Sequence, residues 1–115
     1  MALKHEERLT GVDAKLRDVV KATAKRANFD ITVSEGMRTK ERQAQLFKEG
    51  KTKTLHSKHL IGKAVDLYPL GVDGMINWNG FAALVRLMKI SAAESGISIT
   101  CGYDWGWDKP HFELK

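Results

Sequence analysis

The chain has 115 residues, of which 43% are hydrophobic and 29% charged, so we expect one globular domain over residues 1–115. No apolar run approaches the roughly 18 to 20 residues of a membrane span, and the charged N-terminus lacks the apolar region of a signal peptide. We therefore expect synthesis in a cytoplasm and no stable membrane insertion. The net charge of +5 fits either a well-solvated surface or attraction to a polyanion, but no nucleic-acid-binding pattern is present.

The first half of the chain predicts a helix, a strand and a second helix. Apolar residues at helical spacing indicate a helix over about 13–27 that begins at Asp13. Phe29, Ile31 and Val33 alternate with polar residues, as in a half-buried strand. A second helix is expected over about 39–49 with Thr39 as its cap, and residues 51–62 are expected to form a polar loop.

The second half predicts a strand, a helix and two further strands. Residues 64–68 are apolar and stop at a proline, which suits a central strand, and a third helix should begin at Asn77 or Asn79 and end near Gly96. Strands are expected over 97–101 and 110–114, and the lone Cys101 should be a buried apolar residue there. The fold class is therefore α+β, with a small, mostly antiparallel sheet and about three helices mainly on one face.

Two imidazoles and a carboxylate are candidates for a metal site in a cleft on this sheet. His59 precedes Asp66 by seven residues with Gly62 between them, which favours a histidine on a loop and an aspartate on a strand facing one cleft. His111 could complete the three protein ligands of a catalytic zinc site. The spacing alone also fits a surface His59 and an Asp66 paired with a lysine. His56 is not needed as a ligand.

Other polar and aromatic side chains could act around such a site. Asp108 lies three residues before His111, where it could transfer a proton or simply cap a turn. Arg38 follows the first strand and could hold a substrate carboxylate, and Gln43, one turn further on, could add a hydrogen bond. The residue types alone favour a surface salt bridge for Arg38 and a solvated side chain for Gln43. Trp105 could form a cleft wall or pack in the core.

The combined motifs closely resemble a known family. Ser57-x-His59-x-x-Gly62-x-Ala64-x-Asp66, the later Asp108-x-x-His111, and Glu35-Gly36-x-Arg38-Thr39 upstream are similar to motifs of the zinc D-Ala-D-Ala carboxypeptidase and dipeptidase family of peptidoglycan peptidases. Within it, the chain looks most like the phage L-alanyl-D-glutamate endopeptidases, the endolysin branch. The resemblance covers essentially the whole chain.

The resemblance implies a function and roles for single residues. His59, Asp66 and His111 would hold one zinc ion, Asp108 would be the catalytic acid/base, and Arg38 would bind substrate or stabilise the oxyanion. Gln43, Ser57 and Trp105 are further substrate-binding candidates. The partner would be bacterial peptidoglycan, cleaved between L-Ala and D-Glu by a monomer without a separate wall-binding domain, which waits in the host cytoplasm for release by a holin.

Two alternatives remain open from the sequence. One is a D-Ala-D-Ala carboxypeptidase or dipeptidase on the same scaffold, and the other is a non-catalytic, zinc-containing wall-binding module. A retained Asp108 argues against the second, because binding alone needs no acid/base group.

Overall fold

The computed structural model describes residues 2–52, 54 and 57–115 of the chain. Within these residues, five strands form one sheet in the order β1-β2-β3-β5-β4. They are β1 (Leu3–Lys4), β2 (Ile31–Glu35), β3 (Ala64–Pro69), β4 (Ile99–Cys101) and β5 (His111–Leu114). β1 pairs with β2 in parallel, and the other pairings are antiparallel. The prediction of a mostly antiparallel sheet is confirmed.

The α-helices of the described residues match the predicted ones closely. They are α1 (Ala14–Arg26), α2 (Lys40–Lys48) and α3 (Phe81–Glu94). The Asp13 and Thr39 side chains accept hydrogen bonds from backbone N–H groups of the first turns of α1 and α2, as expected of N-caps. α3 begins later than predicted, after Gly80, because Asn77 and Asn79 belong to the preceding turn. No helix in the described residues is long and apolar enough to cross a membrane.

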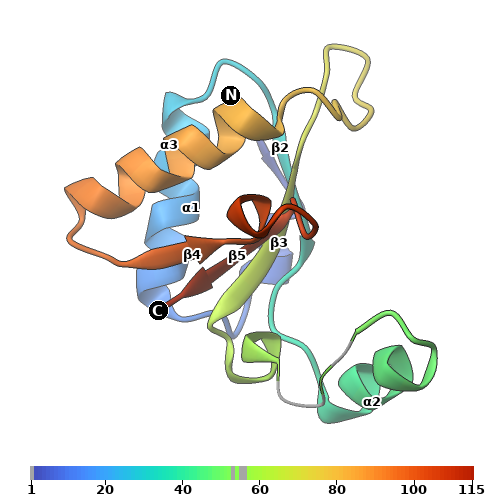
Figure 1. The fold of residues 1–115 in the computed structure, drawn as a ribbon. Helices are drawn as coiled ribbons and strands as arrows, with labels where there is room; N and C mark the ends of the chain where they lie inside the picture. Colours follow the sequence, from blue (N-terminus) through green and yellow to red (C-terminus); the bar gives the residue numbers. More distant parts are fainter. Residues whose placement is uncertain (1, 53, 55–56) are drawn as a thin grey trace.

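The hydrophobic core lies between one face of the sheet and two helices. α1 and α3 contact each other and lie on the same side of the sheet, whereas α2 stands apart, past the end at which β3 starts (Figure 1). Cys101 belongs to this core and is buried, as predicted. The expectation that helices cover mainly one face therefore holds for α1 and α3, whereas α2 lies outside this layer. The largest core side chains come from α1, α3 and three strands: Leu16, Val19, Val20, Ile31, Val33, Leu67, Phe81, Leu84, Met88 and Phe112.

The other face of the sheet carries polar residues at the positions that alternate with the core. Asp66 lies between the buried Val65 and Leu67, and its Cα partner on β5 is His111. Partners in an antiparallel pair point to the same face, so the register alone brings these side chains together. A bulge between Val33 and Glu35 shifts the β2 register by one residue and makes Glu35 the partner of Asp66.

The described N-terminal residues from Ala2 onward are held against β2. β1 pairs with β2, and the backbone N–H of Ala2 donates to the Asp30 carboxylate at 2.9 Å. A two-residue strand has too short a pattern to be recognised in sequence.

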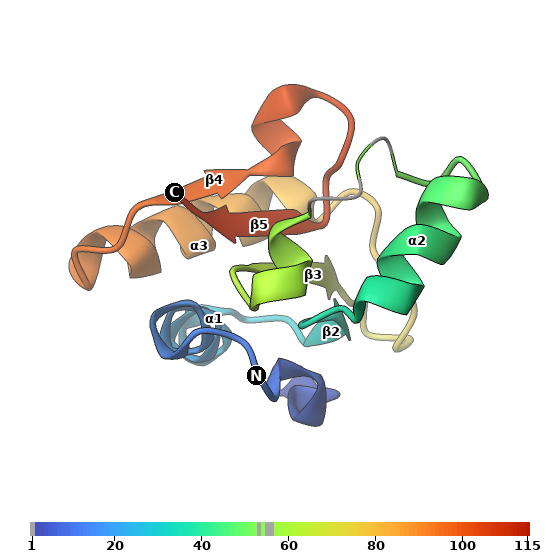
Figure 2. The ribbon, with the colours of Figure 1, turned by 90° about the horizontal axis from the view of Figure 1, so that it is seen from below.

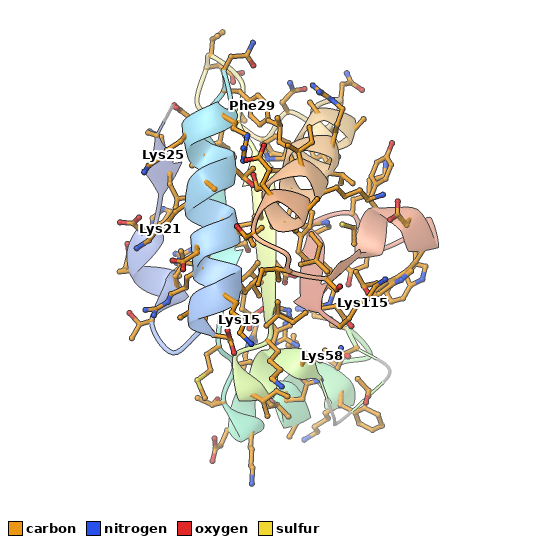
Figure 3. The ribbon with its side chains drawn as sticks, turned by 90° about the vertical axis from the view of Figure 1, so that its left-hand side faces the viewer. Lys15, Lys21, Lys25, Phe29, Lys58 and Lys115 are labelled. Atoms are coloured by element: carbon orange, nitrogen blue, oxygen red, sulfur yellow. The ribbon has the colours of Figure 1, made fainter. Side chains whose placement is uncertain are left out.

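The outer side of α1 carries exposed lysines, including Lys15, Lys21 and Lys25 (Figure 3). Part of the basic charge is therefore a solvated helix face.

Candidate active site

His59 is positioned by a short helix where a plain loop was predicted. The 3₁₀ helix η2 (Lys58–Ile61) begins at Ser57, whose hydroxyl accepts from the His59 backbone N–H at 3.2 Å. The His59 ring is buried, and its Nδ1 lies 2.8 Å from the Gly36 carbonyl oxygen. Because a carbonyl can only accept, Nδ1 carries the proton and the Nε2 lone pair is left for a ligand.

Gly62 is required where η2 meets the N-terminal segment. Its φ of 70° lies in the left-handed region, and a Cβ there would come within 2.3 Å of the Gly11 carbonyl oxygen. Both the backbone conformation and the close approach exclude a larger residue. Gly62 therefore allows η2 to pack closely against the backbone of Gly11.

His59, Asp66 and His111 form a compact group that could hold a metal ion. Their ligand atoms all lie within 4.8 Å of one another. Asp66 Oδ1 is 3.3 Å from His59 Nε2 and 3.4 Å from His111 Nδ1. Zinc–ligand bonds of about 2.0–2.1 Å at tetrahedral angles place ligand atoms about 3.3 Å apart, so both distances have the length of a tetrahedral edge. Asp66 Oδ1 is also buried and has no hydrogen-bond partner, which fits a metal ligand better than an ion pair.

The electrostatics of the group favour a cation. Burial alone would raise the pKa of Asp66, but the adjacent imidazoles of His111 and His59 hold it well below its usual range. Burial would lower the pKa of His111, yet its contacts with Asp66 and Glu113 raise it overall. Both shifts show that the carboxylates here stabilise positive charge on the groups beside them.

Glu113 and Lys58 orient His111 from behind. Glu113 lies two residues after His111 on β5, and its Oε1 is 2.8 Å from His111 Nε2. Its Oε2 is 3.1 Å from Lys58 Nζ, which also donates to the Leu114 carbonyl oxygen at 2.6 Å. A carboxylate that accepts from Nε2–H directs the Nδ1 lone pair toward Asp66.

Asp108 lies beside the group without belonging to it. Its Oδ2 is 3.9 Å from His111 Nδ1, and the side chain is 35% exposed. Burial, followed by the negative charge of Asp66, raises the pKa of Asp108. Its backbone oxygen accepts from the His111 N–H, so the predicted turn is present while the carboxylate faces the cluster. A Cβ on Gly102 would lie 2.0 Å from that oxygen, so glycine is needed to hold the turn in place.

Arg38 is fixed before any ligand arrives. Its Nε and Nη2 each donate to a different oxygen of Glu35 at 2.8 Å, and Nη1 donates to Gln43 Oε1 at 2.7 Å. Three of its five N–H groups are thus used, leaving two for a ligand, although only 9% of the side chain is exposed. The ion pair of Arg38 with Glu35 is thus largely buried and not on the surface. Gln43 is buried as well, so the alternative of a solvated side chain is wrong.

A cavity of about 510 Å³ joins these residues. The cavity is lined by the group of His59, Asp66 and His111 (the metal group) together with Ser57, Arg38 and Asp108. Trp105 also lines it, and its ring centroid is 5.4 Å from that of His111. The cleft wall proposed for Trp105 is therefore present, and Gln43 supports the site from behind through Arg38. His56 lies outside the described residues.

Two supporting carboxylates escaped prediction from the sequence. Glu113 alternates with His111 on a strand, a signal that could have placed both on one face. Glu35 reaches this face only through the β2 bulge, which leaves no clear pattern in sequence.

Fold and site together define an α+β protein with a His-Asp-His group, able to hold a metal, at the base of a cleft. Residues 1–114 match the family of phage L-alanyl-D-glutamate peptidases, and the chain belongs to this family. It is 30% identical to the L-alanyl-D-glutamate peptidase of Escherichia phage T5 over 96% of this chain and 85% of that protein.

A bacterial relative and a solved structure agree with this assignment. The peptidoglycan L-alanyl-D-glutamate endopeptidase CwlK of Bacillus subtilis (strain 168) is 29% identical, over 84% of this chain and 68% of its own length. The crystal structure of the Serratia marcescens L-Ala D-Glu endopeptidase ChiX superposes with a TM-score of 0.91 at 31% identity. That match covers 100% of this chain and 90% of ChiX.

Proposed function

We propose that this protein is a zinc-dependent peptidoglycan endopeptidase that hydrolyses the amide between L-Ala and D-Glu in the peptide stem, and that it acts in bacterial lysis. The relatives named for this activity support the substrate and the bond. The observation that best supports a bound metal is Asp66 Oδ1, which lies buried between two imidazoles and has no hydrogen-bond partner.

The residues present fit zinc in a catalytic rather than a structural site. His59 Nε2, Asp66 Oδ1 and His111 Nδ1 supply the nitrogen and oxygen donors that zinc accepts, and three protein ligands leave one position open. When bound there, zinc supplies Lewis-acid activation of the scissile carbonyl and of the attacking water. The single cysteine, Cys101, is buried in the core and takes no part.

Asp108 is the group that moves the proton. Its carboxylate lies close to the metal group but is not one of its ligands, and its partial exposure lets it exchange protons with solvent. It accepts a proton from the attacking water and then donates one to the leaving amino group of D-Glu. This side chain distinguishes an enzyme from a module that only binds the wall.

Arg38 stabilises negative charge on the substrate. Glu35 and Gln43 hold its guanidinium in one orientation, so its two remaining N–H groups are preorganised to bind a carboxylate or a developing oxyanion. Ser57 caps η2 and is available at the cavity edge as a weaker contact.

Paired substitutions test these roles. Asp108→Ala should keep one zinc per chain and lose lysis of cell walls by about 100-fold or more. His59→Ala should lose the metal itself, as measured by elemental analysis of the dialysed protein. Full wall lysis by either variant would contradict the role given to that residue.

A further inference from the structure

Two tryptophans form an aromatic wall that starts at a metal ligand and runs outward. Trp105 ends the 3₁₀ helix η3 (Gly102–Trp105), and its ring is tilted by 36° against His111 at 5.4 Å between centroids. Trp107 continues the stack, 5.4 Å from Trp105 at an interplanar angle of 32°. The two tilted indoles form an aromatic stack beside His111, and both line the cavity.

Packing among the described residues does not account for this wall. Trp105 is 39% exposed and Trp107 71% exposed, and the ring contact of Trp107 is with Trp105. The third tryptophan, Trp78, is also exposed but packs against Tyr68 and the core residue Phe81, and it does not line this cavity. Indole rings exposed in a cleft favour a ligand with an apolar face, because contact removes both apolar surfaces from water.

The chemistry of the proposed substrate supplies such a face at the right distance. In peptidoglycan, the L-Ala of each stem is amide-bonded to the lactyl group of N-acetylmuramic acid. One residue and one lactyl group separate the scissile carbonyl from the sugar, a reach of about 7 Å when extended. The wall begins at the His111 ring and extends outward by one further ring spacing of 5.4 Å, so a pyranose ring would meet it.

The two walls of the cavity differ in a way that fixes the direction of the substrate. Arg38, which follows β2 and is ion-paired with Glu35, lines one side of it, and the tryptophans line another side from η3 and the residues just after it. α2 and η3 stand on different sides of β3 (Figure 2). D-Glu carries a carboxylate that suits the two unused N–H groups of the Arg38 guanidinium. The sugar, attached on the L-Ala side, is left to face the uncharged aromatic wall.

We infer that Trp105 and Trp107 form a subsite for the N-acetylmuramoyl ring, and that the protein selects stems still attached to the glycan over free stem peptides. The inference rests on the proposed cleavage of the L-Ala–D-Glu bond. The C–H face of the sugar packs on the indole faces, and the indole N–H groups remain available to its polar substituents.

Two matched substrates test the subsite. One is an N-acetylmuramoyl stem peptide, and the other is the same peptide carrying only a lactoyl group. The native protein should cleave the first with a kcat/KM about tenfold higher or more, a ratio that corresponds to about 1.4 kcal/mol of binding. Trp107→Ala should bring the ratio of the two kcat/KM values close to one, and the control Trp78→Ala should keep the native ratio.

A binding measurement separates contact from catalysis. In the Asp108→Ala protein, the uncleaved N-acetylmuramoyl peptide should shift the indole N–H resonances of Trp105 and Trp107 and leave that of Trp78 in place. A native ratio near one, or an unchanged ratio in Trp107→Ala, would overturn the subsite while cleavage itself continued. Failure to release a peptide with a D-Glu amino terminus from either substrate would overturn the proposed function and the subsite together.

Discussion

Removal of the Glu113 carboxylate should weaken metal binding without touching a ligand. Glu113 accepts from His111 Nε2 at 2.8 Å and is itself held by Lys58 at 3.1 Å. In Glu113→Ala the His111 ring loses this partner, so its proton can move to Nδ1, the atom that faces Asp66. The metal would then have to displace that proton and reorient the ring before binding.

The size of the loss follows from the kind of contact. Outer carboxylates of this type typically contribute 10- to 100-fold to metal affinity, so the zinc dissociation constant should rise by about that factor, or about 1.4 to 2.8 kcal/mol. Glu113→Gln should lose less, because its amide oxygen can still accept from Nε2–H. Competition with a chromophoric chelator measures both constants.

An exposed pair of the same type provides the control. Glu7 contacts His5 Nδ1 at 3.3 Å on the surface, so Glu7→Ala removes an equivalent carboxylate far from the metal group and should leave zinc affinity unchanged. If a folded Glu113→Ala protein bound zinc within about twofold of the native value, the orienting role would be refuted.

Three further predictions concern the metal, Arg38 and the thiol. Removing zinc with a chelator should lower the melting temperature measured by calorimetry, and adding zinc back should restore it. A ligand at about 1,000 times its dissociation constant adds about 4 kcal/mol to the free energy of unfolding. Glu35→Ala takes away two of the three side-chain hydrogen bonds that orient Arg38 and should reduce kcat/KM by about 10- to 100-fold with zinc content unchanged. The control Glu41→Ala on α2 should leave kcat/KM unchanged. Equal losses of kcat/KM in the two variants would argue against preorganisation of Arg38. Burial raises the pKa of Cys101 to about 11, so iodoacetamide should label it at pH 8 only after unfolding, and rapid labelling of the native protein would contradict its place in the core.

Regular elements with a clear period could be predicted from the sequence. α1 and α2 were recognisable because capping residues precede apolar spacing. β2 was recognisable because apolar and polar positions alternate, and β3 because a short apolar run ends at a proline. The metal group could be predicted because its residues sit in dense motifs, and the pairing of Asp66 with His111 places two of them on one face of the sheet.

Features set by contacts between distant segments could not be predicted. β1 is too short to show a pattern, and η2 was expected as a loop because its start depends on a hydroxyl contact made by Ser57. The roles of Glu35 and Glu113 depend on contacts between strands and with η2. A bulge in β2 turns Glu35 toward the site, and Lys58 of η2 forms an ion pair that holds the Glu113 carboxylate in place. Burial of Gln43 follows from its bond to Arg38, which local propensity does not encode.

Mass spectrometry of purified muropeptides digested by the zinc-loaded protein tests the central claim most directly. The account predicts new products with a free D-Glu amino terminus, together with muramoyl saccharides that retain only L-Ala. Release of free D-Ala with the L-Ala–D-Glu bond intact would contradict it and favour a D-Ala-D-Ala carboxypeptidase or dipeptidase on the same scaffold.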